Sequence, residues 1–233
     1  MLDLSKSKNF LGDIQNNSSE KLNFFWLGSQ SYKPIWNLQK EIHDLVKKEK
    51  LNDIFLLLEH EHVYTLGKNA NSDHLLPSYP KEADVVKIDR GGEITYHGPG
   101  QLVGYPIINL SKYRKSVSWY MRVLEQIIMD SLDKIGLLSH RKQDLTGVWV
   151  DDAKICAMGV RLSRWITMHG FALNFNPEMR FFDGMIPCGI FEFGVTSIAE
   201  CIDIEIQIFE LAEIISQTVK EKFSYDYLER QII

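Results

Sequence analysis

Arg90-Gly91-Gly92-Glu93-Ile94-Thr95-Tyr96-His97-Gly98-Pro99-Gly100-Gln101 joins two apolar segments, residues 85–88 and 102–110, that we expect to be strands. Its four glycines tolerate positive φ and let the backbone come close to a ligand. The segment leads into a strand, and Gly98, Gly100 and Gly104 miss the GxGxxG spacing by one position, which argues against a dinucleotide-binding turn. The chain has no GxxxxGK[ST] phosphate loop either. The stretch therefore predicts either a ligand-contacting loop or a purely structural double turn.

Hydrophobic periodicity on both sides of this stretch predicts more strands than helices. We expect strands at residues 22–27, 54–58, 63–66, 85–88, 102–110, 147–150, 154–160 and 166–175, and helices at 34–49, 117–135 and 208–223. Residues 147–150 and 154–160 should form a hairpin around Asp151-Asp152. Because several strands follow one another directly, the pattern predicts an α/β fold of the α+β type, with a mixed β-sheet flanked by helices.

Composition limits the classes of protein that remain possible. The chain has 233 residues, of which 45% are hydrophobic, and a formal net charge of −5, which does not favour a nucleic-acid binder. Its longest apolar run, Ile54–Leu58, is too short to span a membrane. We expect residues 1–20 to form a poorly ordered polar leader and residues 21–233 to form a single domain. The leader has no apolar core segment of the kind that a secretory signal contains, so we expect a cytoplasmic protein.

Three cysteines, Cys156, Cys188 and Cys201, are the candidate nucleophiles. Cys188 lies between Pro187 and Gly189, in a turn that could present a reactive thiol, although a buried structural thiol is an equally good interpretation. Cys156 lies in an apolar run and Cys201 in a polar context, and both are better explained as structural. With no CxxC pair, we expect no zinc site.

Lys154 opens the apolar run that contains Cys156. A half-buried ammonium there would favour a nearby thiolate, whereas a lysine at a hairpin edge would only hold its charge in water. His60 and His62 are two residues apart and could form a metal pair, but no third ligand has a suitable spacing. Structural or substrate-pocket roles are the better prediction for both histidines.

Four segments together resemble the octanoyltransferase family, the lipoyl(octanoyl) transferases of lipoate biosynthesis. They are Arg90–Tyr105 (RGGEITYHGPGQLVGY), Lys154–Gly159 (KICAMG), Met168–Asn176 (MHGFALNFN) and Ile186–Ile190 (IPCGI). They occur in the family's order, and the resemblance covers roughly residues 20–225. Two features depart from the family pattern: the polar leader, and Cys156, which could be a second labelling site.

The resemblance implies a fold like the catalytic domain of biotin and lipoate protein ligases, over residues 21–233. It also implies a catalytic Cys/Lys dyad at Cys188 and Lys154, with no cofactor and no metal. The substrate-binding residues that it implies are Arg90, Gly91, Gly92, Glu93, Ile94, Thr95, Tyr96, His97, Ala157, Met158, Gly159, Gly170, Phe171 and Ala172.

The implied partners are octanoyl-acyl carrier protein as donor and, as acceptors, the lipoyl domains of 2-oxoacid dehydrogenase complexes and the glycine cleavage H protein. The resemblance implies a monomer that binds neither nucleic acid nor membrane. Three alternatives stay open on sequence grounds. They are an ATP-dependent lipoate or biotin ligase, a thiol hydrolase, and a non-catalytic carrier-binding protein in which Cys188 is structural.

Overall fold

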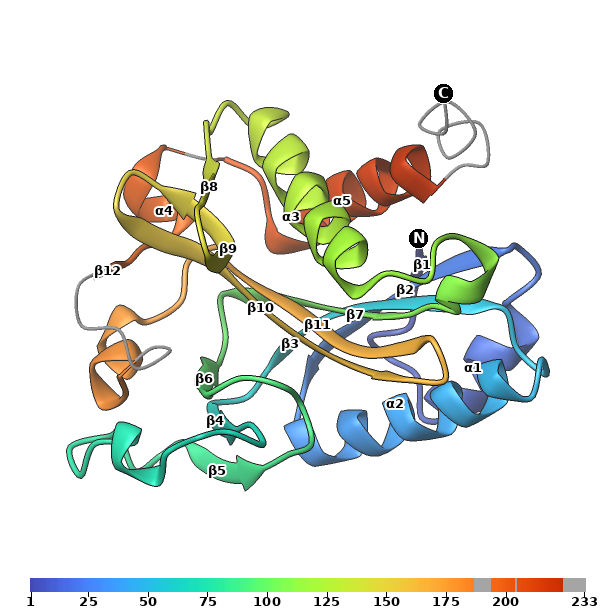
Figure 1. Ribbon diagram of the computed structural model, residues 1–233, viewed down its shortest axis with the longest axis horizontal. Coiled ribbons are helices and arrows are strands. Elements are labelled where there is room, and N and C mark those ends of the chain that lie inside the picture. The colour runs from blue at the N-terminus through green and yellow to red at the C-terminus, as the bar shows by residue number, and fades with distance from the viewer. Residues whose placement is uncertain (187–193, 204, 224–233) are drawn as a thin grey trace.

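The computed structural model describes residues 1–186, 194–203 and 205–223, and these residues form two sheets. The larger, nine-stranded sheet has the order β1-β2-β3-β7-β11-β10-β9-β8, with β12 paired to β10 (Figure 1). Its strands are β1 (Leu2–Asp3), β2 (Leu22–Gln30), β3 (Asp53–His60), β7 (Gln101–Ile107), β8 (His140–Lys142), β9 (Leu145–Val150), β10 (Ala153–Ser163), β11 (Ile166–Asn174) and β12 (Gly194–Val195). β1, β2 and β3 run parallel, while the path from β3 to β8 is antiparallel. The predicted mixed sheet is therefore confirmed.

The smaller sheet has three strands in the order β5-β4-β6, and it carries the glycine-rich stretch at one end. Its strands are β4 (Val63–Leu66), β5 (Asp84–Lys87) and β6 (Ile94–His97). β6 was not predicted, because its four residues lie between two glycine pairs whose turn-forming tendency hides a short strand. Short 3-10 helices lie in the connections between these elements. They are η1 (Ser72–His74), η2 (Leu110–Lys112) and η3 (Met179–Gly184).

Helices cover both faces of the larger sheet (Figure 1). They are α1 (Phe10–Asn16), α2 (Tyr32–Lys47), α3 (Val117–Asp133), α4 (Ile198–Cys201) and α5 (Ile208–Phe223). α3 and α5 pack on one face over Phe55 and Leu57, while α1 and α2 pack on the other over Ile54 and Leu56. Successive residues of β3 thus enter opposite hydrophobic clusters, as the two-residue period of a strand requires. Because both faces are covered, the run 54–58 is continuously apolar.

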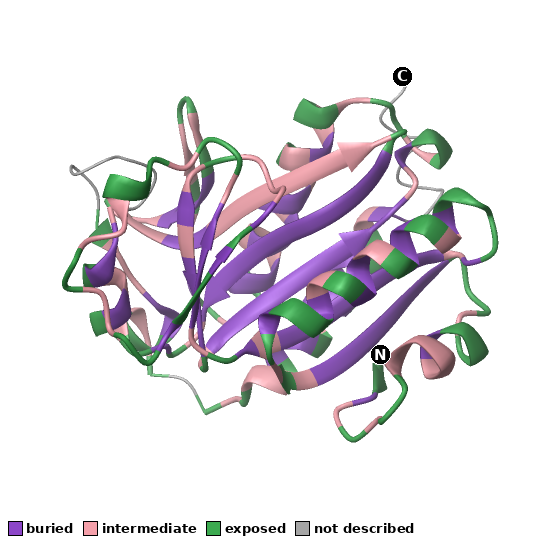
Figure 2. Ribbon diagram, turned by 90° about the horizontal axis from the view of Figure 1, so that it is seen from below, coloured by how far each residue is buried: buried purple, intermediate pink, exposed green. Residues whose placement is uncertain are grey.

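α2 shows how the sequence pattern becomes packing. Its predicted apolar positions, Ile35, Leu38, Ile42 and Val46, are all buried against the sheet. Figure 2 shows this helix crossing the buried strands with exposed residues on its outer side. No helix in the described part of the chain combines the length and the apolar character needed to cross a membrane.

The first residues differ from the expected poorly ordered leader. β1 pairs in parallel with β2, with Leu2 opposite Phe25, and α1 buries Ile14 completely. Leu4 is also buried, in the same hydrophobic cluster as α2. Although residues 1–20 are mostly polar, the burial of Leu4 and Ile14 holds this segment against the domain. The segment thereby adds one short edge strand to the sheet and covers that edge.

The other predicted elements appear within a few residues of their expected bounds. The hairpin around Asp151-Asp152 is confirmed, with Ala153 opposite Val150. α5 has the predicted bounds, Ile208–Phe223. β7 ends at Ile107, earlier than expected, because the chain turns into η2 at Leu110.

Candidate active site

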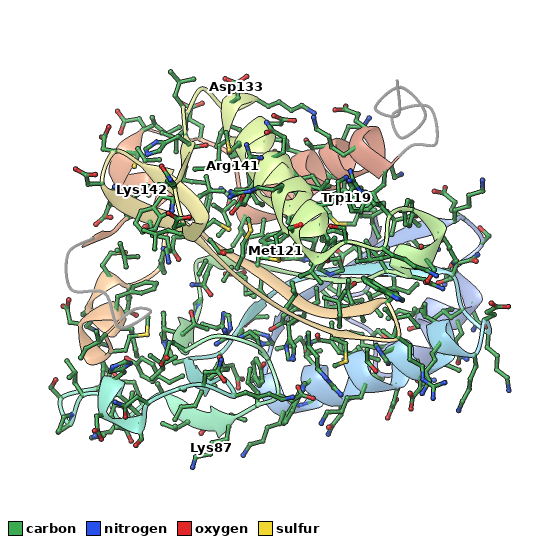
Figure 3. The ribbon with its side chains drawn as sticks, viewed as in Figure 1. Lys87, Trp119, Met121, Asp133, Arg141 and Lys142 are labelled. Carbon is green, nitrogen blue, oxygen red and sulfur yellow. The ribbon has the colours of Figure 1, made fainter. Side chains whose placement is uncertain are left out.

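A cavity of about 360 Å³ opens where β10 and β11 meet the glycine-rich stretch. Helix α3 contributes Met121 to its wall, and Figure 3 shows this residue between the helix and the β10–β11 strands. The volume lies within the usual range of small-molecule pockets. The lining residues are Tyr32, Arg90, Gly91, Gly92, Glu93, Ile94, Thr95, His97, Tyr105, Met121, Asp144, Leu145, Thr146, Lys154, Ala157, Met158, Gly159, Val160, His169, Gly170, Phe171 and Ala172.

The structure brings almost all the sequence-predicted site residues to this one cavity. Lys154 lines it, as do thirteen of the fourteen expected substrate-binding residues: Arg90, Gly91, Gly92, Glu93, Ile94, Thr95, His97, Ala157, Met158, Gly159, Gly170, Phe171 and Ala172. Three segments that are far apart in sequence, 90–97, 154–159 and 170–172, therefore converge. The two remaining expected residues are Tyr96 and Cys188. Tyr96 does not line the cavity, and Cys188 lies outside the described residues.

Tyr96 points away from the cavity. Neighbouring residues of β6 point to opposite sides: Thr95 and His97 reach the cavity, whereas Ile94 and Tyr96 enter the core of the smaller sheet. Of these two core residues, Ile94 also lines the cavity and Tyr96 does not. Its ring stacks on Phe181 at 5.0 Å between centroids, and its hydroxyl is 2.7 Å from His62 Nδ1. Burial raises the pKa of Tyr96 well above its ordinary value. Tyr96 therefore supports the glycine-rich stretch from behind.

Arg90 holds the glycine-rich stretch in shape. Its guanidinium donates to the carbonyl oxygens of Gly91 and Glu93, at 2.7 and 2.8 Å. Its side chain lies against Gly159 of β10, where an added Cβ would come within 2.8 Å of Nη1 and 2.9 Å of Cδ. Glycine at position 159 is thus required by the close approach of Arg90, which joins the RGG and KICAMG segments physically.

A β-bulge in β10 sets the direction of Lys154. Lys154 pairs with Trp149, but Cys156 pairs with Val148, so Ile155 is the extra residue. Such a bulge re-aims the side chains beside it. The aliphatic part of Lys154 lies beside Gly147, which has a φ of +129° and where an added Cβ would come within 2.7 Å of the Cys156 carbonyl oxygen. The Lys154 ammonium lies 4.8 Å from the centre of the Trp149 ring.

The chain returns to Lys154 directly after residues 187–193. β12 pairs in parallel with β10, placing Gly194 opposite Ala153 and Val195 opposite Lys154. The Thr196 N–H then donates to the Lys154 carbonyl at 3.1 Å. On the other side of the segment, the Ile186 N–H donates to the His74 carbonyl at 2.9 Å. Both flanks of residues 187–193 are therefore fixed by backbone hydrogen bonds.

His60 is a buried, uncharged histidine that supports the polar wall of the cavity. His60 donates from Nδ1 to the Gln30 carbonyl and accepts at Nε2 from the Tyr105 hydroxyl, both at 2.8 Å. Burial lowers the pKa of His60 to about 4, so the ring is uncharged at neutral pH and this assignment of its hydrogens is the consistent one. Tyr105, which lines the cavity, is thereby fixed.

His97 begins a chain of hydrogen bonds that ends beside Lys154. Its Nδ1 donates to Gln101 Oε1 at 2.7 Å, Gln101 donates to Asn174 Oδ1 at 3.0 Å, and Asn174 donates to the Thr196 carbonyl at 2.9 Å. Burial lowers the pKa of His97 to about 3, and its ring stacks on that of Tyr32 at 6.0 Å. These three hydrogen bonds link the glycine-rich stretch to Thr196, the residue that follows β12.

His169 is a further polar residue of the cavity lining. Its Nε2 donates to Asp89 Oδ1 at 3.1 Å, and its backbone N–H donates to Gln39 Oε1 at 3.0 Å. The hydrogen bond from His169 is the main cause that lowers the pKa of Asp89 to about 2, and the Arg161 guanidinium adds to it. His169 has a φ of +59°, a left-handed conformation that is uncommon outside glycine and often found at functional sites.

The two described cysteines do not line the cavity, and the burial of Cys156 agrees with its interpretation as a structural thiol. Cys156 is completely buried in the main hydrophobic cluster, and burial raises the pKa of its thiol far above the ordinary value. It is therefore inaccessible and protonated, which removes the suggestion that it is a second labelling site. Cys201 is half-buried, with Sγ 3.5 Å from the Thr196 hydroxyl.

No group of three potential metal ligands occurs among the described histidine, cysteine, aspartate and glutamate residues. His60 and His62 do not act as a pair: His60 is bonded to Tyr105, and His62 to Tyr96. Both histidines are instead part of the support beneath the cavity.

Several lining residues were not singled out from the sequence. Tyr105 and His169 lie inside the matching segments and could have been selected there as polar residues on strands. Tyr32, Met121 and residues 144–146 lie in segments with no motif, and only the fold brings them to the cavity.

Comparison with known proteins gives a consistent family. The lipoyl protein ligase A/B catalytic domain matches residues 31–220. An octanoyltransferase from Nostoc punctiforme is 46% identical over 195 residues, which are 83% of this chain and 83% of that protein. Among solved structures, a bipartite lipoate protein ligase studied with its E2 lipoyl domain from Thermoplasma acidophilum aligns with a TM-score of 0.63 and 13% identity, covering 86% of this chain and 82% of that one.

A biotin protein ligase from Aquifex aeolicus aligns with a TM-score of 0.51 and 15% identity, over 86% of this chain and 71% of that one. These two similarities confirm the expected resemblance to the fold of lipoate and biotin protein ligases. With a family match over most of its length and a relative at 46% identity, the chain belongs to the octanoyltransferase family.

Proposed function

We propose that this protein transfers an octanoyl group from octanoyl-acyl carrier protein to a lysine of lipoyl domains, through a thioester on Cys188. The acceptors are the lipoyl domains of 2-oxoacid dehydrogenase complexes and the glycine cleavage H protein. The observation that carries the proposal is the convergence of Lys154 with the three predicted binding segments on a single cavity.

The wall chemistry of the cavity suits an acyl thioester. Met121, Met158, Phe171 and Ala172 offer apolar surface for an alkyl chain. Arg90, Tyr105 and His97 provide polar groups at the same cavity, and their hydrogen bonds hold them in place before a substrate binds. Preorganised polar groups of this kind stabilise developing charge at little reorganisation cost.

The proposed dyad is compatible with the length of the chain. Six residue steps separate Cys188 from Gly194, which is paired opposite Ala153. An extended chain of that length spans roughly 20 Å at most. This length is compatible with an approach of Cys188 to Lys154 in the proposed dyad, where a cation beside a thiol would favour the thiolate.

The proposed reaction has two balanced halves. The Cys188 thiolate attacks the thioester carbonyl, a new C–S bond forms as the bond to the carrier sulfur breaks, and the departing carrier thiolate takes its proton from the Lys154 ammonium. The amine of the acceptor lysine then attacks the octanoyl-enzyme, an amide forms, and Cys188 is released as thiolate. Lys154 holds the thiolate in the first half and accepts the amine's proton in the second. Conversion of a thioester into an amide is downhill, so the reaction needs no ATP.

Exposed basic residues offer a way to attract acidic carrier domains. Lys112 is occupied by the buried Asp53, at 3.2 Å, and Arg161 by Asp89. The better candidates for contact with a carrier domain are the exposed residues Arg114, Lys115 and Arg164. Arg164→Glu should therefore raise the KM for the carrier-bound donor, and an unchanged KM would remove Arg164 from the docking surface.

The test is a transfer assay with octanoyl-acyl carrier protein and a lipoyl domain, without ATP. Octanoylated lipoyl domain should form with the unaltered protein and with Cys201→Ala, and should be abolished in Cys188→Ser. Cys201 is a matched control because its half-buried thiol lies in the described part of the chain, away from the cavity lining. Full transfer by Cys188→Ser, or transfer only when ATP is added, would overturn the proposal.

A further inference from the structure

Trp149 is a buried aromatic residue in contact with the ammonium of the cavity lysine. It is 1% exposed and does not line the cavity. It lies directly opposite Lys154 on the neighbouring strand, so the two side chains share one face of the sheet. The Lys154 ammonium is 4.8 Å from the ring centre, inside the distance at which a tryptophan face attracts a cation.

We propose that Trp149 is a positioning residue that holds the Lys154 ammonium at the cavity wall by a cation–π interaction. This inference deepens the proposed function and rests on it, because it concerns the lysine of the proposed dyad. Lysine has a long flexible side chain, and confining it in one conformation costs rotamer entropy. A fixed aromatic face offsets part of that cost and limits where the ammonium can lie.

The surrounding structure limits the direction that the Lys154 side chain can take. The β-bulge at Ile155 turns the strand directly after Lys154, and the lysine's methylenes lie beside Gly147 on the neighbouring strand. Ile155 and Val148, next to the two partners, are completely buried, so the Trp149 backbone and the strand carrying Lys154 are both held by the core. The ring therefore stands on a rigid support, as a positioning residue requires.

A second lysine contacts the same ring. Lys142 of β8 has its ammonium 5.2 Å from the ring centre and forms an ion pair with Asp152 Oδ1 at 2.5 Å. Figure 3 shows Lys142 on the strands at the β8–β9 end of the sheet. Lys142 is paired with a carboxylate and does not line the cavity. Of the two lysines that contact the Trp149 ring, Lys154 is therefore the one that faces the cavity.

Fluorinated tryptophans test this interaction without changing the packing. Each added fluorine weakens the negative potential of the ring face while leaving its shape almost the same. Site-specific incorporation at position 149 of mono-, di- and trifluorotryptophan should lower kcat for octanoyl transfer stepwise, by about 2- to 30-fold over the series. The KM for the carrier-bound donor should change little, because Trp149 does not contact the cavity.

Trp165 provides the matched control, since it is one of the chain's five tryptophans, is 38% exposed and does not line the cavity. The same series at position 165 should leave kcat unchanged, and Trp149→Phe should retain more activity than Trp149→Leu at equal folded fraction. A flat response at position 149, with activity and Tm preserved, would overturn the inference alone. Absence of any transfer by the protein with ordinary tryptophan would instead refute the proposed function, so the two failures are distinguishable.

Discussion

Val195 lies opposite Lys154 in the parallel pairing of β12 with β10, one residue after the chain returns from residues 187–193. The hydrogen bond from the Thr196 N–H to the Lys154 carbonyl fixes this arrangement. The backbone of the cavity lysine is thus tied to the end of the segment that carries Cys188. In the proposed mechanism this link would help to bring together two groups that are 34 positions apart in sequence.

Gly159→Ala should impair substrate binding more than folding. An added Cβ would meet Arg90 at 2.8–2.9 Å, so the arginine would have to move and its bonds to Gly91 and Glu93 would be disturbed. We expect the KM for the donor to rise by roughly tenfold or more, the size expected when a charged hydrogen-bonding group is misplaced. Steady-state kinetics of the variant measures this effect.

Gly136→Ala is the control for this substitution. Gly136 follows α3, has open space around it and a φ of +81°, so alanine there costs stability through backbone strain without touching the cavity. It should lower Tm and leave the KM unchanged. An equal KM for Gly159→Ala and the unaltered protein would show that Arg90 does not need its place against β10.

Acid should destabilise the protein through its buried histidines. The pKa values of His60 and His97 are lowered to about 4 and about 3, whereas an unfolded histidine has a pKa near 6.5. Between these values the unfolded chain binds more protons, so stability is fully present above about pH 6.5 and falls as the pH drops. Each histidine contributes a loss of about 1.4 kcal/mol per pH unit in this window.

Urea unfolding at pH 6.5 and pH 5 measures the effect. His97→Asn should reduce the loss of unfolding free energy between the two pH values by roughly 2 kcal/mol relative to the unaltered protein. His140→Gln, at an exposed position of β8, should keep the full loss. If His97→Asn and His140→Gln lose stability equally, the burial of His97 does not govern the acid response.

Met121 should influence the preferred length of the acyl chain. It is the α3 residue that lines the cavity, together with the apolar side chains of Phe171 and Met158. Met121→Ala enlarges that wall, so the ratio of decanoyl to octanoyl transfer should rise roughly tenfold, since one or two methylenes in an apolar pocket are worth that much. Competition between the two carrier-bound donors measures the ratio directly.

Met129→Ala is the matched control, because Met129 lies on the same helix, packs against the core and does not line the cavity. It should lower stability and leave the donor ratio unchanged. The same change in donor ratio for both variants would mean that the ratio reports the looseness of α3 rather than the size of the cavity.

Local pattern was sufficient for much of this architecture. The spacing of Ile35, Leu38, Ile42 and Val46 predicted α2, and the two turn aspartates predicted the β9–β10 hairpin, since both signals act within a few residues. The leader was misjudged because a few apolar residues, Leu4 and Ile14 among them, hold it against the core. The average composition of a segment does not reveal so few buried positions.

The site shows the same division between local and long-range information. The motifs identified three of the segments that line the cavity, but alternation along β6 separates Thr95 and His97 from Tyr96, and the strand itself was hidden among glycines. The bulge at Ile155 and the contact of Lys154 with Trp149 depend on strand register. Register is set by packing across the whole sheet, which a single segment does not encode.

A thioester on Cys188 can be detected by intact-protein mass spectrometry after mixing the protein with octanoyl-acyl carrier protein in the absence of ATP, followed by peptide mapping. One added octanoyl group is expected, mapped to the Cys188 peptide and lost when a lipoyl domain is supplied. No adduct is expected on Cys156, whose thiol is buried and protonated. The absence of an adduct, or an adduct on another residue that is passed to the lipoyl domain, would contradict transfer through Cys188.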